Sequence, residues 1–144
     1  MIKILELKDA DYEELESINE LLPQLSSSAE LLDIQRLKVL INSESTIVYI
    51  AQDDHGKILG TLSLVTIEIP TGRKGWIEDV VVDQSARGKG IGKALMNHAL
   101  EKAVKFGLKS VDLTSRPSRE EANMLYQSLG YQKRETNVYR YNFS

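Results

Sequence analysis

The chain of 144 residues contains no cysteine, which excludes disulfide bridges, thiol nucleophiles and zinc sites built on cysteine. Histidine is also scarce, because His55 and His98 are the only imidazoles and lie far apart in the sequence. We therefore expect no catalytic metal, although sites made of carboxylates alone are not excluded by this argument.

Long apolar runs are missing as well. No run approaches the roughly 20 residues that a membrane-spanning helix needs, and Met1 to Glu6 lack the apolar stretch of a signal peptide. A cytoplasmic protein is therefore expected. The net charge of −3 argues against nucleic acid as the main partner, since such domains carry a strong basic face.

What is present is the ordinary balance of a globular domain, with 42% hydrophobic and 27% charged residues. The length suits one domain over residues 1–144. Polarity patterns and turn residues predict strands and helices in mixed order, and hence an α/β sheet covered on both faces. The predicted elements are a strand over Ile2–Leu7, a helix from Asp9 stopped by Pro23, a helix from Ser26–Ser28 to Ile41, strands over Thr46–Gln52, Lys57–Ile69 and Trp76–Val82, a loop over Pro70–Gly75, a helix over Gly90–Phe106, a strand over Ser110–Thr114, a helix from Ser118 to Leu129, and a strand or hairpin over Tyr131–Asn142.

A glycine-rich turn, Arg87-Gly88-Lys89-Gly90-Ile91-Gly92-Lys93, follows a buried strand and opens a helix. Glycines let the backbone turn tightly and bring bare N–H groups close to a ligand. The first N–H groups of a helix have no partner inside it, and the helix dipole attracts anions there. With the charges of Arg87, Lys89 and Lys93, the turn is predicted to bind a pyrophosphate.

The sequence of this turn has other possible interpretations. A Walker phosphate loop fails, because Gly92-Lys93 is followed by Ala94 and Arg87 stands where its first glycine is needed. A dinucleotide-binding turn needs Gly-x-Gly-x-x-Gly directly after the strand, whereas this chain has Gly-x-Gly-x-Gly. Asp112 nevertheless lies about the right distance downstream for the acidic residue of such a fold, so this alternative stays open. A plain strand-to-helix turn without a ligand is the remaining alternative.

Two adjacent carboxylates, Glu78 and Asp79, lie in the otherwise apolar strand before this turn. Burying a carboxylate is costly unless it is paired, so Glu78 could simply face solvent or pair with Arg73 or Lys74. A carboxylate near an acyl donor could instead take the proton of an ammonium group, and burial would raise its pKa into a useful range. Neighbouring strand residues face opposite sides unless a bulge intervenes.

The stretch Gln84-Ser-Ala-Arg87-Gly88-Lys89-Gly90-Ile91-Gly92 resembles the acetyl-CoA pyrophosphate loop of the GNAT N-acetyltransferase family, whose pattern Gln/Arg-x-x-Gly-x-Gly/Ala it matches from Arg87 to Gly92. Ala122-Asn-Met-Leu125-Tyr126-Gln-Ser-Leu129-Gly130-Tyr131 is similar to the family's Ala-x-x-x-Tyr-x-x-x-Gly-Phe signature. The resemblance is specific over Trp76 to Tyr131. Arg119 departs from it, because many members carry Asn there, which leaves open how the chain meets CoA on that side.

The resemblance implies a mixed, mostly antiparallel sheet of six to seven strands with helices on both faces and a splayed strand pair that receives the pantetheine arm. It implies acetyl-CoA as co-substrate, no metal, no nucleic acid or membrane partner, and a homodimer. A strand bulge, also a family feature, would free the N–H groups of Val80 and Val82. The residues implied to contact the cofactor are Val80, Val81, Val82, Arg87, Gly88, Lys89, Gly90, Ile91, Gly92, Lys93, Asn123 and Tyr126.

The catalytic roles also come from the resemblance. Trp-Ile-Glu78-Asp79-Val80 is similar to the Glu-Asp pair of glucosamine-6-phosphate and diamine acetyltransferases, which implies Glu78 as the base and Asp79 as a second choice or a helper. Periodicity alone makes Tyr126 a core aromatic, whereas the resemblance implies a general acid for the leaving thiolate.

The function that we expect is direct acetyl transfer to a primary amine of a small molecule in a ternary complex. The alternatives are a protein acceptor, through an N-terminus or a lysine, and a non-catalytic sensor of acyl-CoA.

Overall fold

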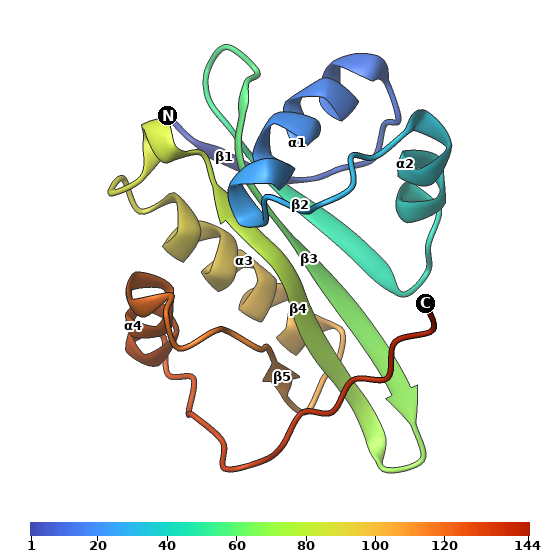
Figure 1. Cartoon of the computed structure of the whole chain (residues 1–144), viewed down its shortest axis with the longest axis vertical. Coiled ribbons are helices and arrows are strands. Elements are labelled where there is room, and N and C mark those ends of the chain that lie inside the picture. The colour runs from blue at the N-terminus through green and yellow to red at the C-terminus, as the bar shows by residue number, and fades with distance from the viewer. The chain divides into compact units, whose positions relative to one another are not determined.

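The structure is a computed structural model that describes all 144 residues. The chain forms two compact units, residues 1–114 and residues 115–144. The elements are β1 (Lys3–Glu6), α1 (Tyr12–Leu25), α2 (Ile34–Ile41), β2 (Thr46–Gln52), β3 (Ile58–Ile69), β4 (Gly72–Val82), the 3₁₀ helix η1 (Gln84–Ala86), α3 (Ile91–Lys105), β5 (Val111–Asp112) and α4 (Glu120–Ser128) (Figure 1).

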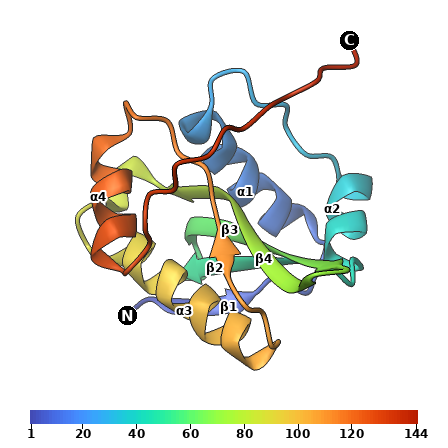
Figure 2. The ribbon, with the colours of Figure 1, turned by 90° about the horizontal axis from the view of Figure 1, so that it is seen from below.

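The first unit is built on one sheet in the order β1-β2-β3-β4-β5. The pairs β1–β2, β2–β3 and β3–β4 are antiparallel, and β4–β5 is parallel. Helices α1 and α3 lie on opposite sides of these strands (Figure 2). The prediction of a mixed α/β sheet with helices on both faces is confirmed, whereas the prediction of six to seven strands is wrong, because the sheet has five.

Each face of the sheet has its own apolar layer. On one face, Leu15 and Leu21 of α1 pack in the same cluster as Leu37 of α2 and Val81 of β4. Leu37 is completely buried there. On the other face α3 lies so close to β3 that a Cβ on Gly60 would come within 3.1 Å of Leu95 Cδ1. A side chain at this glycine would therefore require its neighbours in α3 and β4 to shift by a few tenths of an ångström.

Two helix boundaries differ from the prediction. Helix α1 begins after Asp11, whose carboxylate accepts a hydrogen bond from Glu14 N–H at 2.9 Å, and it continues through Pro23 to Leu25. Pro23 removes one N–H of the last turn, which a helix end tolerates better than its middle. Helix α2 begins at Ile34 rather than at the serines, because Asp33 caps it by accepting from Arg36 N–H at 2.8 Å.

The predicted loop over residues 70–75 is mostly strand. Strand β4 begins at Gly72, which pairs with Ile69 of β3, so the two strands form a long hairpin. The polar residues of this part favoured a loop prediction, but Arg73 is exposed at the end of the hairpin, where it lies opposite Glu68, and Lys74 is half-buried opposite Ile67. Arg73 and Glu68 form an ion pair of 2.8 Å.

Strands β4 and β5 part soon after they meet. Strand β5 has two residues, and only Gly75 and Trp76 of β4 pair with it. From Ile77 to Val82, β4 keeps β3 as its neighbour and has an unpaired edge on the other side. This is the splayed strand pair that the sequence predicted, with its fork at Trp76.

The second unit contains α4 and the residues after it. Gly130 follows the helix with φ of 99°, the left-handed conformation that glycine adopts readily at a helix end. Residues 131–144 form no strand, so the predicted final strand or hairpin is wrong. The pattern of aromatic and β-branched residues is there, but Val138, Tyr139 and Tyr141 stay 70% to 87% exposed and have no apolar layer to complete.

Candidate functional site

The glycine-rich turn forms an uncapped helix N-terminus. Gly88 and Gly90 adopt φ of 81° and 78°, which L-residues with a side chain rarely adopt. Gly90 is the N-cap of α3 and offers no side chain to the first turn. The first backbone hydrogen bond into the helix runs from Ala94 N–H to Gly90 O at 3.0 Å. The N–H groups of Ile91, Gly92 and Lys93 are thus left for an anion.

The space in front of these glycines is open. A Cβ on Gly88 or Gly90 would meet no atom within 4 Å, so the positive φ, and not crowding within the chain, is what requires glycine. Ile91 behaves differently, because its side chain is buried and lies beside Gly60 of β3. Of the predicted cofactor contacts, Ile91 can therefore offer its backbone N–H alone.

Basic side chains surround the turn. Arg87, Lys89 and Lys93 are exposed, and none of them forms an ion pair within the chain. Arg87 Nε donates to Val82 O at 3.3 Å, which connects the turn to the end of β4. The three charges are free to meet a phosphate group, although the whole chain is acidic.

A second connection to the turn was missed by sequence reasoning. The Gln24 side chain at the end of α1 donates to Asp83 Oδ1 at 2.8 Å and accepts from Gln84 N–H at 2.9 Å. The hydrogen bonds from Ser85 and Gln24 hold the pKa of Asp83 below its ordinary value. Nothing in the local sequence signals this clamp, because 59 and 60 residues separate its partners.

Strand β4 is interrupted by a bulge where the carboxylates lie. Thr61 pairs with Val81 and Ser63 pairs with Glu78, so Leu62 alone lies opposite Asp79 and Val80. Asp79 has φ of 54°. The bulge is the one that the family resemblance implied, and it bends the strand where two residues oppose one.

The bulge leaves N–H groups on the unpaired edge of β4. Asp83 N–H donates to Leu59 O of β3 at 2.7 Å. Because alternate N–H groups of a regular strand point in opposite directions, Val82 directs its N–H away from β3. Val81 fills the core instead and is 4% exposed, so it can contribute only backbone to a ligand.

Glu78 lies in solvent rather than in a buried pocket. The expectation that burial tunes this carboxylate is wrong, because Glu78 and Asp79 are both exposed. Of the alternatives to a catalytic role, exposure to solvent is observed and an ion pair with Arg73 is not, since Arg73 bonds to Glu68. The observed partner of Glu78 is Trp76, whose indole N–H donates to Glu78 Oε1 at 2.6 Å.

The remaining predicted residues belong to the second unit. Tyr126 of α4 is 5% exposed, and burial raises the pKa of its phenol while the nearby Arg119 opposes the shift. The phenol is therefore protonated at neutral pH, as a general acid must be. Asn123 Nδ2 donates to Arg116 O at 3.0 Å, and Arg119 is the N-cap of the helix.

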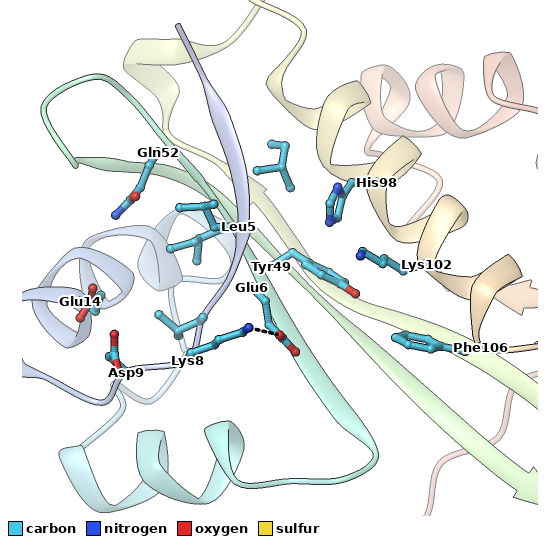
Figure 3. Close-up of a pocket in the computed structure, with 13 residues that line it drawn as sticks. Leu5, Glu6, Lys8, Asp9, Glu14, Tyr49, Gln52, His98, Lys102 and Phe106 are labelled. Atoms are coloured by element: carbon cyan, nitrogen blue, oxygen red, sulfur yellow. Dashed lines mark ion pairs between the residues drawn. The ribbon is translucent and has the colours of Figure 1, made fainter.

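A cavity of about 670 Å³ lies elsewhere, along the free edge of β1 (Figure 3). His98 packs edge-on against Tyr49 there with ring centroids 4.9 Å apart, as a packed histidine rather than a catalyst would. Burial raises the pKa of Tyr49 to about 12 and lowers that of His98. None of the predicted site residues lines this cavity, so it is not the site that the sequence indicates.

Two broader features complete the description. No group of three or more His, Cys, Asp or Glu residues lies close enough together to hold a metal ion. No helix is both long and apolar enough to cross a membrane.

The chain is similar to known proteins in sequence and in structure. A family model described as "Acetyltransferase (GNAT) family" matches residues 4–131. The glucosamine 6-phosphate N-acetyltransferase of Trypanosoma brucei brucei is 34% identical over 137 residues, which is 91% of each chain. An uncharacterized N-acetyltransferase of Bacillus subtilis is 31% identical over 93 residues, 65% of this chain and 66% of that protein.

Among solved structures, an acetyltransferase of Trypanosoma brucei superposes with a TM-score of 0.81 at 27% identity, covering 99% of this chain and 100% of that one. The chain spans 66%, 26% and 35% of the lengths of the first three curated relatives that it matches. These findings support the predicted enzyme class, an acetyl-CoA-dependent N-acetyltransferase.

Proposed function

Because the chain belongs to the GNAT acetyltransferase family, we propose that it transfers the acetyl group of acetyl-CoA to a primary amine of a small molecule. Residues 1–144 act as one domain in this proposal, and the family match over residues 4–131 supports that extent. The observation that carries the proposal is the bulged, half-unpaired β4 followed directly by an uncapped, glycine-rich helix N-terminus.

In this proposal each part of acetyl-CoA is bound by one of these features. The pyrophosphate would accept hydrogen bonds from the free N–H groups of Ile91, Gly92 and Lys93, with Arg87 and Lys89 adding charge. The amide groups of the pantetheine arm would pair with the unpaired edge of β4 through Val80 and Val82. A backbone N–H near Val80 would stabilise negative charge on the acetyl oxygen.

Acetyl-CoA supplies an activated acyl group whose thiolate leaves readily. Glu78 takes a proton from the acceptor's ammonium group, directly or through water, because only a neutral amine has a lone pair for attack. Asp79 orients the amine or replaces Glu78 in this role. Tyr126 gives a proton to the thiolate of CoA. The chain has no cysteine and no evident activated nucleophile, so direct transfer in a ternary complex is the proposed route.

The proposed acceptor class is supported by the carboxylates of Glu78 and Asp79 and by the names of two relatives. Two relatives are named glucosamine 6-phosphate N-acetyltransferase and L-2,4-diaminobutyric acid acetyltransferase, and both names describe small amines. The exposed Glu78 and Asp79 would attract such ammonium groups. The cytoplasm, where acetyl-CoA is plentiful, and a homodimer remain predictions.

The test is release of CoA thiol from acetyl-CoA, followed with a thiol-reactive dye across amino sugars and their phosphates, polyamines, amino acids, aminoglycosides and short peptides. The chain itself adds no signal because it has no cysteine. We expect saturable release with one class of small amine. Glu78→Gln should abolish turnover and Tyr126→Phe should reduce it, with acetyl-CoA affinity unchanged in both.

Glu68→Gln is the matched control, because it removes an exposed carboxylate from the neighbouring strand and should leave turnover intact. Release with peptides alone would transfer the proposal to a protein acceptor. Binding of acetyl-CoA without release for any amine would indicate a sensor. No binding of acetyl-CoA at all would refute the proposed function.

A further inference from the structure

Trp76 lies at the fork of the splayed strands. It is the last residue of β4 that pairs with β5, where it lies opposite Asp112. Two residues further along, Glu78 lies on the part of β4 that β5 leaves unpaired. Because side chains two apart on a strand share a face, Trp76 and Glu78 project on the same side of the sheet.

The two side chains are joined by a short hydrogen bond, 2.6 Å from Trp76 Nε1 to Glu78 Oε1. The indole N–H is a donor only, so the carboxylate oxygen is the acceptor of this bond. Glu78 forms no ion pair, and no second hydrogen bond to its carboxylate occurs. One oxygen is therefore held, and Oε2 is left for another donor.

An exposed glutamate ordinarily moves among several rotamers, and holding it in one costs conformational entropy. The hydrogen bond from half-buried Trp76 restricts these rotamers before a ligand arrives, so less conformational entropy is lost when the ligand binds.

We propose that Trp76 is a positioning residue for Glu78: its N–H holds Oε1 so that Oε2 meets the acceptor's ammonium group and receives its proton. The inference rests on the proposed function of Glu78 as the base. It assigns Trp76 to the acceptor side of the reaction and leaves the binding of acetyl-CoA independent of it.

The composition of the chain makes a direct test available, because Trp76 is its only tryptophan. Growth on ¹⁵N-labelled tryptophan gives one indole N–H resonance, which reports this hydrogen bond alone. We expect Glu78→Gln to move the resonance upfield, because a neutral amide accepts a weaker hydrogen bond than a carboxylate. Glu68→Gln should leave it in place. If the chemical shift of the indole N–H does not change in Glu78→Gln, the inference is overturned.

The kinetic test also depends on Trp76 being the only tryptophan. Replacing tryptophan throughout the protein with β-(3-benzothienyl)alanine keeps the ring shape at position 76 and removes only the N–H. We expect kcat/KM for the amine to fall about tenfold, as for loss of one hydrogen bond to a charged group, and KM for acetyl-CoA to stay unchanged. Trp76→Phe, which also lacks the indole N–H, should show the same fall in kcat/KM for the amine and the same unchanged KM for acetyl-CoA.

Full activity of the benzothienyl protein would show that the ring acts by shape alone, and the inference would fail. The outcomes for the two proposals differ. If the native chain acetylates an amine and the benzothienyl protein does so equally well, only the role of Trp76 is refuted. If the native chain acetylates nothing, the proposed function is refuted as well.

Discussion

At the scale of single residues, Asp79 is the position where the backbone departs furthest from a regular strand. Its φ of 54° lies in the left-handed region, which costs a residue with a Cβ about 1–2 kcal/mol. Asparagine and aspartate tolerate this region better than other residues with side chains, and β-branched residues tolerate it least. The carboxylate next to the predicted base therefore occupies a strained position.

This strain gives a prediction about stability. Asp79→Gly should raise the free energy of unfolding by about 1 kcal/mol, Asp79→Asn should leave it nearly unchanged, and Asp79→Val should lower it by about 1–2 kcal/mol. Urea denaturation of the three variants measures the order. Equal stability of the asparagine and valine variants would contradict the positive φ at this residue.

Prediction from sequence worked unevenly for individual residues. The glycines and basic residues of the turn are local in sequence, and their spacing carries the chemistry. For Glu78 the sequence left solvent exposure or a pair with Arg73 or Lys74 open, and it did not indicate the hydrogen bond from the Trp76 indole that the structure has. The Gln24 clamp could not be predicted, since its hydrogen bonds join residues about 60 positions apart and depend on how α1 packs.

At the scale of secondary-structure elements, α3 has a left-handed glycine at each end. Gly90 before it and Gly107 after it have φ of 78° and 74°, and a Cβ on either would meet no atom within 4 Å. Alanine at either position should therefore cost similar stability, about 1–2 kcal/mol. Only Gly90 adjoins the proposed pyrophosphate site.

Acetyl-CoA binding should separate the two glycines. We expect Gly90→Ala to weaken binding about tenfold, because an alanine strains the turn that directs the N–H groups toward the phosphates, and Gly107→Ala to leave the Kd unchanged. Isothermal titration calorimetry gives both values. A similar loss of affinity in both variants would mean that the turn has no special part in binding.

The clamp between α1 and η1 leads to a second prediction for elements. Gln24→Leu removes both hydrogen bonds to the Asp83–Gln84 segment that precedes the glycine-rich turn. We expect KM for acetyl-CoA to rise several-fold, since each lost hydrogen bond is worth about 1 kcal/mol, with little change in KM for the amine. Gln35→Leu, at an exposed position of α2, is the control. An unchanged KM in Gln24→Leu would show that the turn keeps its shape without the clamp.

The elements themselves were largely predictable. Strand β2 and helix α3 have strong periodicity and clear turn residues at their ends, and both appear where expected. The errors concern segments whose state depends on a partner strand. The polar start of β4 is a strand because β3 pairs with it, and residues 131–144 have a strand pattern without forming one.

At the scale of the whole molecule, the stability of the fold should depend on pH through the start of α1. The hydrogen bond to the Asp11 side chain, aided by partial burial and by the charges of Asp11, Asp9 and Glu13, raises the pKa of Glu14 from 4.5 to about 7. The same hydrogen bond lowers the pKa of Asp11. Glu14 therefore keeps its proton to a higher pH in the folded chain than in the unfolded chain.

The sign of the effect follows from proton linkage. Between about pH 4.5 and 7 the folded chain binds more protons at Glu14 than the unfolded chain does, so the free energy of unfolding falls as pH rises. Glu14→Gln keeps a donor for Asp11 and cannot ionise, so it should flatten this fall. Glu16→Gln on the same helix should not. Urea unfolding at pH 5, 6, 7 and 8 compares the slopes, and an unaltered slope in Glu14→Gln would contradict the raised pKa of Glu14.

The bulge in β4 has a consequence for how this molecule can change over generations. Asp79 amounts to a one-residue insertion in an otherwise regular ladder, because Ser63–Glu78 and Thr61–Val81 pair normally on either side of it. A deletion of this codon would restore the ladder, relieve the left-handed residue and straighten the strand. Selection for folding alone would favour that deletion. The bulge therefore exchanges some stability of the sheet for a bent strand next to the proposed site.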